Sequence, residues 1–515
     1  MDVSSIESAG AEQFVRDPGK RLLRGVPDIR SFFRTNQTPI YFISPTPFNL
    51  LGIESWVRNF HYIGYYDPFD GRHASLFAPQ AREQRAWRSM EEINNYLLGN
   101  PEVDDFVRRR GAGKAVFVMF DEATEALAAQ LGLEVALPRA ELRERLDSKI
   151  VTTRLGNEAG VPSVPNVLCR AADYDALDAL ARSAGLGDDL VVQMPYGDSG
   201  RTTFFIKSAA GWDRYAAKHA LAAEELKVMR RIRNRALAVE AVITRHGTLV
   251  GPVMADLTGY PELTPYPGGW CGNDVFPTVL SSDRLRRVRT LTQYLGERLK
   301  REGYRGFFEI DYLLDLDADE LYLGEINPRI SGITSMTDVT AGAFAEMPLF
   351  LFHLLEYMDV DYEIDVAEIN ACWAQAENVD VWGQAVIKQT DDIVGLITKV
   401  PRSGIWKMDA FGRISFASDA TDWSALYDET QAFFLRIAGP GEYLYRGAEL
   451  GIFVSRCRLQ TDDGTRLTEI CRLWVEGFRQ QYEFEPLQLG AAGAAAIPDR
   501  SITTSPGFKS VGGES

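Results

Sequence analysis

The stretch 307-FFEIDYLLDLDADELYLGEINPR-329 contains the pattern that decides the fold. Apolar and polar residues alternate on both sides of the acidic segment 314–320, as in two strands joined by a turn. Side chains along a strand alternate between its faces, so Glu309 and Asp311 share one face of the first strand. Glu325 and Asn327 share one face of the second. The stretch therefore predicts a β-hairpin on which two polar faces meet.

Three acids and an amide that converge between apolar strands would repel one another unless a cation neutralised them. Oxygen donors of this kind suit Mg²⁺ or Mn²⁺, especially an ion that also contacts phosphates. A pair such as Glu325 and Asn327 also occurs at the solvent-exposed end of ordinary strands. The hairpin alone leaves both interpretations open.

Helix and strand patterns surround this hairpin. The segment 147–160, DSKIVTTRLGNEAG, predicts a helix that is capped by Asp147 or Ser148 and ends at Gly160. Leucine and valine at helical spacing predict another helix over 283–301. Strands are expected at the following ranges: 40–44, 115–120, 190–194, 202–206, 235–243 and 247–254. A helical stretch is expected over 51–60 and a last amphipathic helix around 467–481.

Length and composition indicate a large soluble multidomain protein. The chain has 515 residues, a hydrophobic fraction of 45% and a net charge of -17. This acidic balance argues against a nucleic-acid partner. The five cysteines are far apart and predict neither a zinc site nor a disulfide framework. No apolar run is long enough for a membrane helix and the N-terminus lacks a signal-peptide pattern, so the expected location is the cytoplasm.

The order of these patterns predicts an α/β and α+β architecture of three domains between two tails. The tails are expected at 1–36 and 488–515. The predicted domains are an α/β domain at 37–147, a central domain at 148–358 with a smaller subdomain at about 165–235, and a mixed α/β domain at 359–487.

The hairpin, GYRGFFEIDYLL followed by GEINPR, resembles the metal-binding end of the ATP-grasp superfamily of carboxylate-amine ligases. The resemblance implies an N-terminal pre-ATP-grasp domain and a glycine-rich lid. It also implies that Asp311, Glu325 and Asn327 hold two magnesium ions beside ATP, with Glu309 as a substitute for Asp311. Arg329 then resembles the arginine that stabilises the acyl phosphate.

The loop PYGDSGRTTFF at 195–205 resembles the glycine-rich lid that closes over the triphosphate. Glycine lets backbone amides approach phosphate oxygens that a Cβ atom would keep away. A Gly-x-x-Gly sequence between strands is also typical of a plain hairpin turn. The residues implied in phosphate contact are Gly197, Gly200, Ser199, Thr202 and Thr203, with Arg201 adding a catalytic positive charge.

Lys149 resembles the lysine that opens the nucleotide-binding region of the family. A second family lysine stands on the strand before the glycine-rich loop, where this chain has Gln193. Glutamine can hydrogen-bond to a phosphate or to adenine but adds no charge. Either Arg201 supplies the missing charge or the affinity for nucleotide is lower.

Three further segments take their expected roles from the same resemblance. KVMRRI at 227–232 resembles the hinge strand that meets adenine, with Met229 and Ile232 covering the ring. Glu240 resembles the acid near the ribose or the metal, although strand packing would explain it equally well. The loop 264–277 matches in position the loop that reaches the acceptor substrate, which makes Trp270, Asn273 and Asp274 candidates.

The outline of the chain also resembles biotin carboxylase, including its C-terminal domain. The bicarbonate motif of that family is missing, because Ser331 and Ile333 stand where glutamine and glutamate are expected, and there is no biotin attachment sequence. The resemblance therefore favours a ligase that joins a small-molecule carboxylate, such as an amino acid or peptide, to an amine. The alternatives are a carboxylase and an ATP-binding regulator without turnover. A homodimer is compatible with the family.

Overall fold

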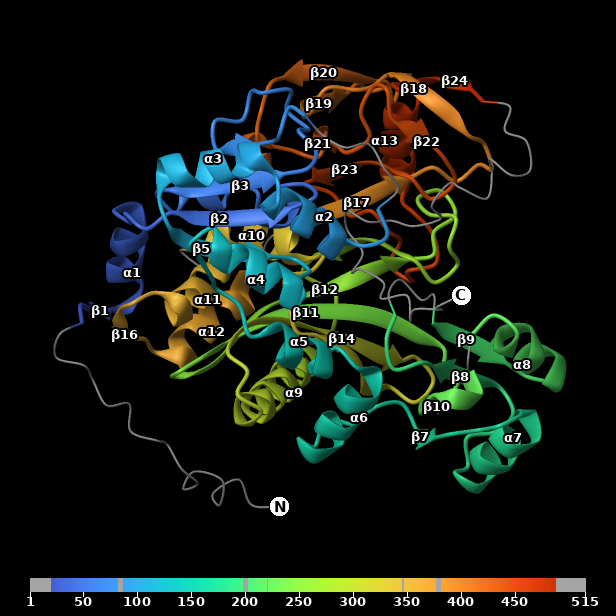
Figure 1. Cartoon of the computed structure of the whole chain (residues 1–515). Helices are drawn as coiled ribbons and strands as arrows, with labels where there is room; N and C mark the ends of the chain where they lie inside the picture. The colour runs from blue at the N-terminus through green and yellow to red at the C-terminus, as the bar shows by residue number, and fades with distance from the viewer. Residues whose placement is uncertain are drawn as a thin grey trace.

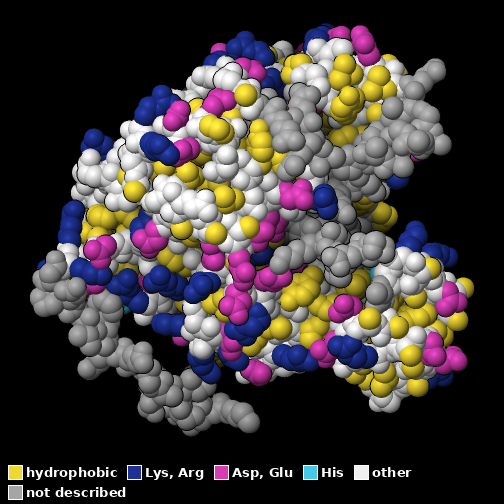
Figure 2. All heavy atoms as spheres, in the orientation of Figure 1, with side chains coloured by type: hydrophobic (Ala, Val, Ile, Leu, Met, Phe, Trp, Pro, Cys, Tyr) yellow, Lys and Arg dark blue, Asp and Glu magenta, His cyan; other side chains and the backbone are white. Residues whose placement is uncertain are grey.

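The computed structural model describes residues 20–81, 87–197, 202–219, 221–344, 347–376 and 381–487 (Figure 1). The described chain forms a parallel sheet near the N-terminus, a small antiparallel sheet, and one long antiparallel sheet that runs through the centre of the molecule. Figure 2 shows basic and acidic side chains interspersed over one face of the molecule. Among the described residues, no helix combines the length and the apolar composition that a membrane span requires.

The first sheet is parallel and has the strand order β4-β3-β2-β5-β6. Its central strand is β2 (Ile40–Ser44), in which every residue is buried. Burial on both faces explains why IYFIS is continuously apolar up to its last residue instead of alternating. The other strands are β3 (Phe60–Gly64), β4 (Leu76–Phe77), β5 (Gly113–Phe117) and β6 (Leu133–Val135). The helices of this region are α2 (Met90–Leu98), α3 (Pro101–Arg110), α4 (Glu122–Gln130) and α5 (Ala140–Leu146).

The helix predicted over 51–60 is wrong. Two short 3-10 turns, η2 (Phe48–Leu50) and η3 (Ile53–Ser55), take its place. Gly52 between them has a φ of 89°, a left-handed conformation that interrupts a helix. Both turns lie where the first sheet meets the rest of the molecule, so the chain there is shaped by tertiary packing.

The predicted N-terminal tail is also wrong for its described part. Residues 22–34 form strand β1 (Leu22–Arg24) and helix α1 (Gly25–Arg34). Strand β1 pairs in parallel with β16 (Asp361–Glu363), and Ile29 and Phe33 of α1 are fully buried in the core beneath the first sheet. This segment is therefore an integral part of the fold.

The second sheet has four antiparallel strands in the order β7-β10-β8-β9. All four strands lie between residues 166 and 230, within the range predicted for the lid. They are β7 (Asn166–Cys169), β8 (Leu190–Gln193), β9 (Thr203–Ile206) and β10 (Leu226–Arg230). Helices α7 (Tyr174–Ser183) and α8 (Ala209–Ala216) and the turn η4 (Leu221–Ala223) belong to the same lobe, which lies to the right in Figure 1. The lobe has its own small hydrophobic core.

The long sheet contains ten antiparallel strands in the order β15-β14-β11-β12-β13-β17-β23-β21-β19-β20. The predicted hairpin is confirmed as its edge pair, β14 (Gly306–Asp315) and β15 (Glu320–Asn327). Strand β13 pairs with β17, so strands from both sides of residue 359 share one sheet. The remaining strands are β11 (Asn234–Thr244), β12 (Gly247–Thr258), β13 (Trp270–Val275), β17 (Trp382–Lys388), β19 (Gly404–Met408), β20 (Ile414–Ser418), β21 (Gln431–Arg436) and β23 (Glu449–Ser455).

Helices pack on this sheet and bury its apolar side chains. The predicted helix over 283–301 is confirmed as α9 (Ser282–Arg301), which buries its leucine and valine face against β11 and β12. The last helix, α13 (Glu469–Arg479), closes the core of the C-terminal strands through Trp474 and Phe478. The other helices are α6 (Lys149–Glu158), α10 (Thr334–Phe344), α11 (Phe350–Tyr357) and α12 (Val366–Ala376). A turn, η5 (Trp423–Ala425), and a small sheet of β22 (Tyr443–Leu444), β18 (Gly395–Lys399) and β24 (Glu483–Pro486) complete the described fold.

Candidate nucleotide and metal site

The β14–β15 hairpin places the predicted metal-binding side chains together. Glu309 is opposite Asn327, and Asp311 is opposite Glu325. Asn327 Nδ2 donates a hydrogen bond to Asp311 Oδ2 at 3.3 Å, and Arg329 Nη2 donates to Asn327 Oδ1 at 2.6 Å. The sequence pattern of alternating faces thus leads directly to a compact polar group at one edge of the sheet.

Lys149 connects this group to the lid. The lysine begins helix α6, is 6% exposed, and forms an ion pair with Glu325. Its Nζ also donates to the carbonyl oxygen of Gly197 at 3.0 Å, and its backbone N–H donates to the carbonyl oxygen of Pro195 at 2.8 Å. Burial opposes the charged form of Lys149, but the carboxylates of Glu325, Asp147 and Asp311 together outweigh burial and raise the pKa of Lys149. A positive charge is therefore fixed between the hairpin and the base of the loop.

The acids around the hairpin are crowded. Burial raises the pKa of Asp311 well above its usual value, and the Glu309, Glu325 and Asp256 carboxylates raise it further. Burial likewise raises the pKa of Glu309 to about 7. For Glu325, burial raises the pKa, but the Lys149 ammonium, a hydrogen bond with Asp311 and the Arg329 charge together outweigh burial, so the pKa is lowered.

This crowding fits a divalent cation. Carboxylates that are held close together repel one another, and a bound cation relieves this repulsion. Among the described residues, no three His, Cys, Asp or Glu side chains already stand in a geometry that would hold one ion together. The predicted metal-binding set has only two acids, Asp311 and Glu325, with the Asn327 amide as its third oxygen donor. Glu325 is also ion-paired with Lys149.

Asp256 belongs to the acidic group although the sequence analysis did not identify it. It lies on β12, and burial together with Glu309 raises its pKa well above the usual value. Its Oδ1 accepts a hydrogen bond of 2.5 Å from Asn273 Nδ2 on the neighbouring strand β13. The sequence does mark Asp256 as an isolated acid in the apolar run VMADL at 253–257. Its place in the site, however, depends on strand pairing that the sequence does not show.

Lys227 is the second residue that sequence reasoning missed. It lies on β10 directly opposite Gln193 of β8, so the two side chains share one face of the small sheet. Lys227 is fully buried, and its Nζ donates to the carbonyl oxygen of Gly324 on β15 at 3.3 Å. Burial, and then the nearby Lys149 charge, lower the pKa of Lys227 to about 8. A lysine therefore occupies the same face as Gln193, one strand away.

The glycine-rich loop is described only at its two ends. Gly197 has a φ of 144°, and a Cβ atom there would lie 2.0 Å from Thr202 Oγ1, so the position requires glycine. Thr202 is buried, and Thr203 Oγ1 accepts a hydrogen bond of 3.2 Å from Gln193 Nε2. The predicted contacts from Ser199, Gly200 and Arg201 lie outside the described residues.

The residues predicted to meet adenine and ribose occupy different surroundings. Met229 is 6% exposed and lies two positions after Lys227, so it shares the inner face of β10. Ile232 lies beyond the end of that strand and is half-buried. Glu240, on β11 opposite Glu309, is fully buried and accepts hydrogen bonds from Ser331 Oγ at 3.1 Å and Thr334 Oγ1 at 2.5 Å. Glu240 is thus enclosed beside Glu309, on the strand next to β14.

The three predicted acceptor residues divide into two groups. Asn273 donates to Asp256 and so borders the acidic side chains. The Trp270 indole lies against Gly332, in the loop that follows Arg329. Asp274 points to the other face of β13. Its carboxylate is fully buried and accepts hydrogen bonds from the backbone N–H groups of Leu459 and Gln460 at 2.9 to 3.1 Å. Alternation along the strand sends Asn273 toward the site and Asp274 toward the C-terminal strands.

Comparison with known proteins identifies one distant curated relative and several solved structures of similar fold. No protein-family model matches the chain. A curated relative, the [Butirosin acyl-carrier protein]--L-glutamate ligase of Niallia circulans, is 22% identical over 275 residues. That match covers 49% of this chain and 61% of the relative, so the chain spans less than two thirds of the relative's length.

Solved structures show similarity along most of the chain. The biotin carboxylase domain of 2-oxoglutarate carboxylase from Hydrogenobacter thermophilus, solved with MgADP and bicarbonate, has a TM-score of 0.58 at 11% identity and covers 88% of this chain and 92% of its own. Biotin carboxylase from Campylobacter jejuni gives 0.56 at 12% identity, with 88% and 93% covered. N5-carboxyaminoimidazole synthase from Aspergillus clavatus, solved with ADP and 5-aminoimidazole ribonucleotide, has a TM-score of 0.51 at 11% identity. It covers 82% of this chain and 94% of its own. At these identities the likeness concerns the fold.

Proposed function

Because the chain has the ATP-grasp fold, we propose that it is an ATP-dependent ligase that activates a carboxylate as an acyl phosphate and joins it to an amine. The carboxylate oxygen attacks the γ-phosphorus of ATP, and ADP leaves. The amine then attacks the acyl carbon, forms the C–N bond, and releases phosphate and a proton. The observation that carries the proposal is the hairpin group of Asp311, Glu325 and Asn327 facing two buried lysines.

Some residues of the site would bind the metal ion, and others would stabilise charge on the transferring phosphate. Asp311, Glu325 and Asn327 would hold Mg²⁺ or Mn²⁺, which supplies positive charge at the transferring phosphoryl group. Arg329 lies beside Asn327 and is 5% exposed, so its charge acts in a low dielectric. We assign Arg329 to the developing negative charge on the acyl phosphate. Arg201 would act from the lid loop.

Lys149 and Lys227 would provide the phosphate-binding charges. Lys149 already touches both the hairpin and Gly197, so it lies where nucleotide phosphates must pass between lid and body. Lys227 shares a face with Gln193 and supplies the charge that glutamine lacks. Gln193 would then orient a phosphate or the adenine edge by hydrogen bonding, and Met229 would cover the base.

The curated relative supports an amino-acid carboxylate. That protein joins L-glutamate to an acyl carrier protein, as its name states. An amino acid or a peptide-like acid is therefore our proposed carboxylate substrate. The biotin carboxylases among the structural neighbours, one of them solved with bicarbonate, favour the second candidate, a carboxylase. Ser331 weighs against the carboxylase, because it donates its hydroxyl to the buried Glu240 and offers no base to bicarbonate.

Release of ADP and phosphate tests the proposal. The purified protein is incubated with Mg-ATP and pooled amino acids and amines, with and without bicarbonate, and the products are analysed by mass spectrometry. We expect ADP release that depends on the amino-acid pool and a product with the mass of a condensation. Strict dependence on bicarbonate would establish the carboxylase instead, and ATP binding without turnover would favour a regulator.

A further inference from the structure

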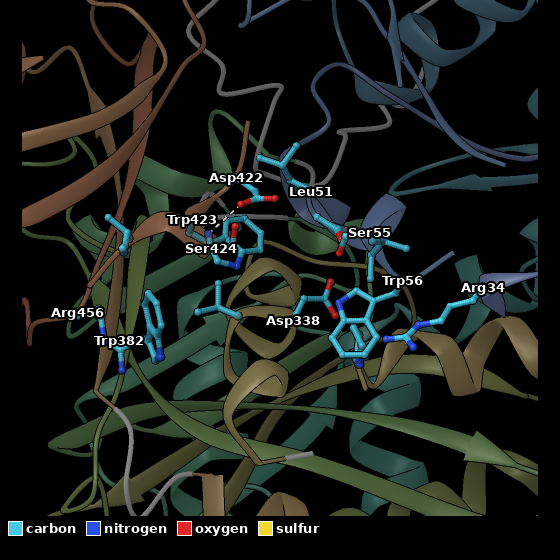
Figure 3. Close-up of a pocket in the computed structure, with 15 residues that line it drawn as sticks. Arg34, Leu51, Ser55, Trp56, Asp338, Trp382, Asp422, Trp423, Ser424 and Arg456 are labelled. Carbon is cyan, nitrogen blue, oxygen red and sulfur yellow. Dashed lines mark hydrogen bonds between the residues drawn. The ribbon is translucent and has the colours of Figure 1, made fainter. Parts of the chain in front are cut away.

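A cavity of about 540 Å³ lies outside the metal and nucleotide residues (Figure 3). Three parts of the chain that are far apart in sequence form its walls. The N-terminal part contributes residues of the turn η3 and its flanks, together with Arg34 at the end of α1. The central part contributes Asp338 and Val339 of helix α10 and Pro348. The C-terminal strands and turn η5 contribute the remainder. The cavity is therefore created only when the first sheet, the central helices and the C-terminal part assemble.

The walls combine aromatic surface with both signs of charge. Three indoles line the cavity, those of Trp56, Trp382 and Trp423. Arg456 stands over the Trp382 ring, with 4.6 Å between Cζ and the ring centroid, and the exposed Arg34 lies at the rim next to Trp56. Such walls suit a ligand with a bulky apolar body and an anionic group.

Asp338 is the acid at the centre of this cavity. In Figure 3 its carboxylate lies between Trp56 and Trp423. The residue is 8% exposed, and neither carboxyl oxygen has a hydrogen-bond partner among the described residues. A buried acid without a partner destabilises a protein, so such a group calls for an explanation beyond packing. A ligand cation that enters the cavity would supply the missing partner.

The cavity adjoins the candidate active site through the start of helix α10. Thr334 and Ser331 both donate to Glu240, and Glu240 pairs with Glu309 across β11 and β14. On the cavity side, Asn49 Nδ2 donates to the Ser331 carbonyl oxygen at 2.6 Å. The loop that follows Arg329 therefore contacts Glu240 on one side and Asn49 on the other, and it leads into the helix that carries Asp338.

We propose that this cavity binds the amine substrate of the ligase, an amino acid or aminoacyl compound with a large apolar side chain. Its ammonium group contacts Asp338, its apolar side chain lies between the indoles, and its carboxylate faces Arg34 or Arg456. This inference rests on the proposed ligase function and names its acceptor class. Asp422 also lines the cavity, but its Oδ1 already accepts from the backbone N–H of Ser424 at 2.8 Å. Asp338 is the assigned ammonium partner because neither of its oxygens has a hydrogen-bond partner among the described residues.

Calorimetric titration in the absence of nucleotide tests the cavity directly. The probes are L-phenylalanine, phenethylamine, which lacks the carboxylate, and hydrocinnamate, which lacks the amine. We expect both amines to bind, and hydrocinnamate to bind roughly tenfold more weakly or not at all, because it leaves Asp338 unpaired. Binding of none of the three, or equal binding of hydrocinnamate and L-phenylalanine, would overturn the proposal.

Two variants place the binding at Asp338. Asp338→Asn keeps the shape of the side chain and should weaken binding of both amines about tenfold or more, with Mg-ATP binding unchanged. Asp428→Asn changes an exposed acid outside the cavity lining and should leave amine binding as in the wild type. Equal amine affinity in Asp338→Asn and wild type overturns the assignment. A wild-type protein that fails to bind Mg-ATP contradicts the ligase instead, and the nucleotide-free titrations still decide the cavity.

Discussion

Gln193 and Lys227 lie opposite each other on β8 and β10. This pair changes which residue we expect to supply positive charge to the nucleotide. From the sequence, Gln193 indicated a lost positive charge. The structure shows a fully buried lysine at the same level of the sheet, hydrogen-bonded to the Gly324 carbonyl next to Glu325. A lysine buried this deeply is costly unless an anion partner uses it, and the nucleotide phosphates are the partner that we propose.

The pair yields a prediction that exchanges two side chains. Lys227→Gln should weaken binding of Mg-ATP by roughly ten- to a hundredfold, because charge-assisted hydrogen bonds to phosphate contribute about 1.5–3 kcal/mol. The double variant Gln193→Lys with Lys227→Gln should recover most of that affinity. Calorimetric titration measures both. Lys207→Gln, which removes a lysine that is exposed and paired with Asp189, is the control. Failure of the double variant to recover affinity would contradict the exchange.

Glu240 gives a prediction for the pH dependence of stability. Burial and the adjacent Glu309 raise its pKa to about 8, so the folded protein holds a proton that the unfolded chain loses near pH 4.5. The stabilisation from this proton is complete below about pH 4.5 and is lost as the pH rises toward about 8. Glu240→Gln stays uncharged and should flatten the fall of Tm between these values. The exposed Glu363→Gln should keep the wild-type slope, and an unchanged slope in Glu240→Gln would refute the assignment.

At the scale of elements, the sequence predicted what local periodicity encodes. The β14–β15 hairpin, α9 and α13 follow from alternation or helical spacing and are confirmed. Helix α1 was missed because charged residues in GKRLLRGVPDIRSFFR hide its apolar face, which only the pairing of β1 with β16 makes useful. Asp256 and Lys227 were missed for a related reason, since each becomes part of the site through strands that are distant in sequence.

Helix α1 can be tested as part of the core. Phe33 is fully buried, so Phe33→Ala should lower the free energy of unfolding by about 3–5 kcal/mol through lost burial and the cavity left behind. Phe411→Ala removes a ring that is 83% exposed and serves as the control. Urea unfolding followed by circular dichroism measures both variants. A change below about 1 kcal/mol for Phe33→Ala would mean that the segment does not contribute to the core as described.

At the scale of the whole molecule, the ATP-grasp fold and the mixed α/β class predicted from the sequence are confirmed by the structural neighbours. The long sheet joins the metal strands to the C-terminal strands through β13 and β17, a pairing that no local pattern announces. One face of β13 therefore serves the acidic group through Asn273, and the other anchors the C-terminal part through Asp274. Substrate identity depends on this assembly, because the cavity around Asp338 draws its walls from all three parts.

The most direct test of the central claim compares ADP release by wild type, Glu325→Gln and Glu320→Gln with Mg-ATP and the amino-acid pool. Both glutamates lie on β15, but Glu325 contacts Lys149 in the acidic group and Glu320 is exposed at the start of the strand. We predict that Glu325→Gln lowers the rate of ADP formation by about 100-fold or more and that Glu320→Gln does not change it. A folded Glu325→Gln protein that releases ADP at the wild-type rate would contradict the metal site and with it the proposed ligase mechanism.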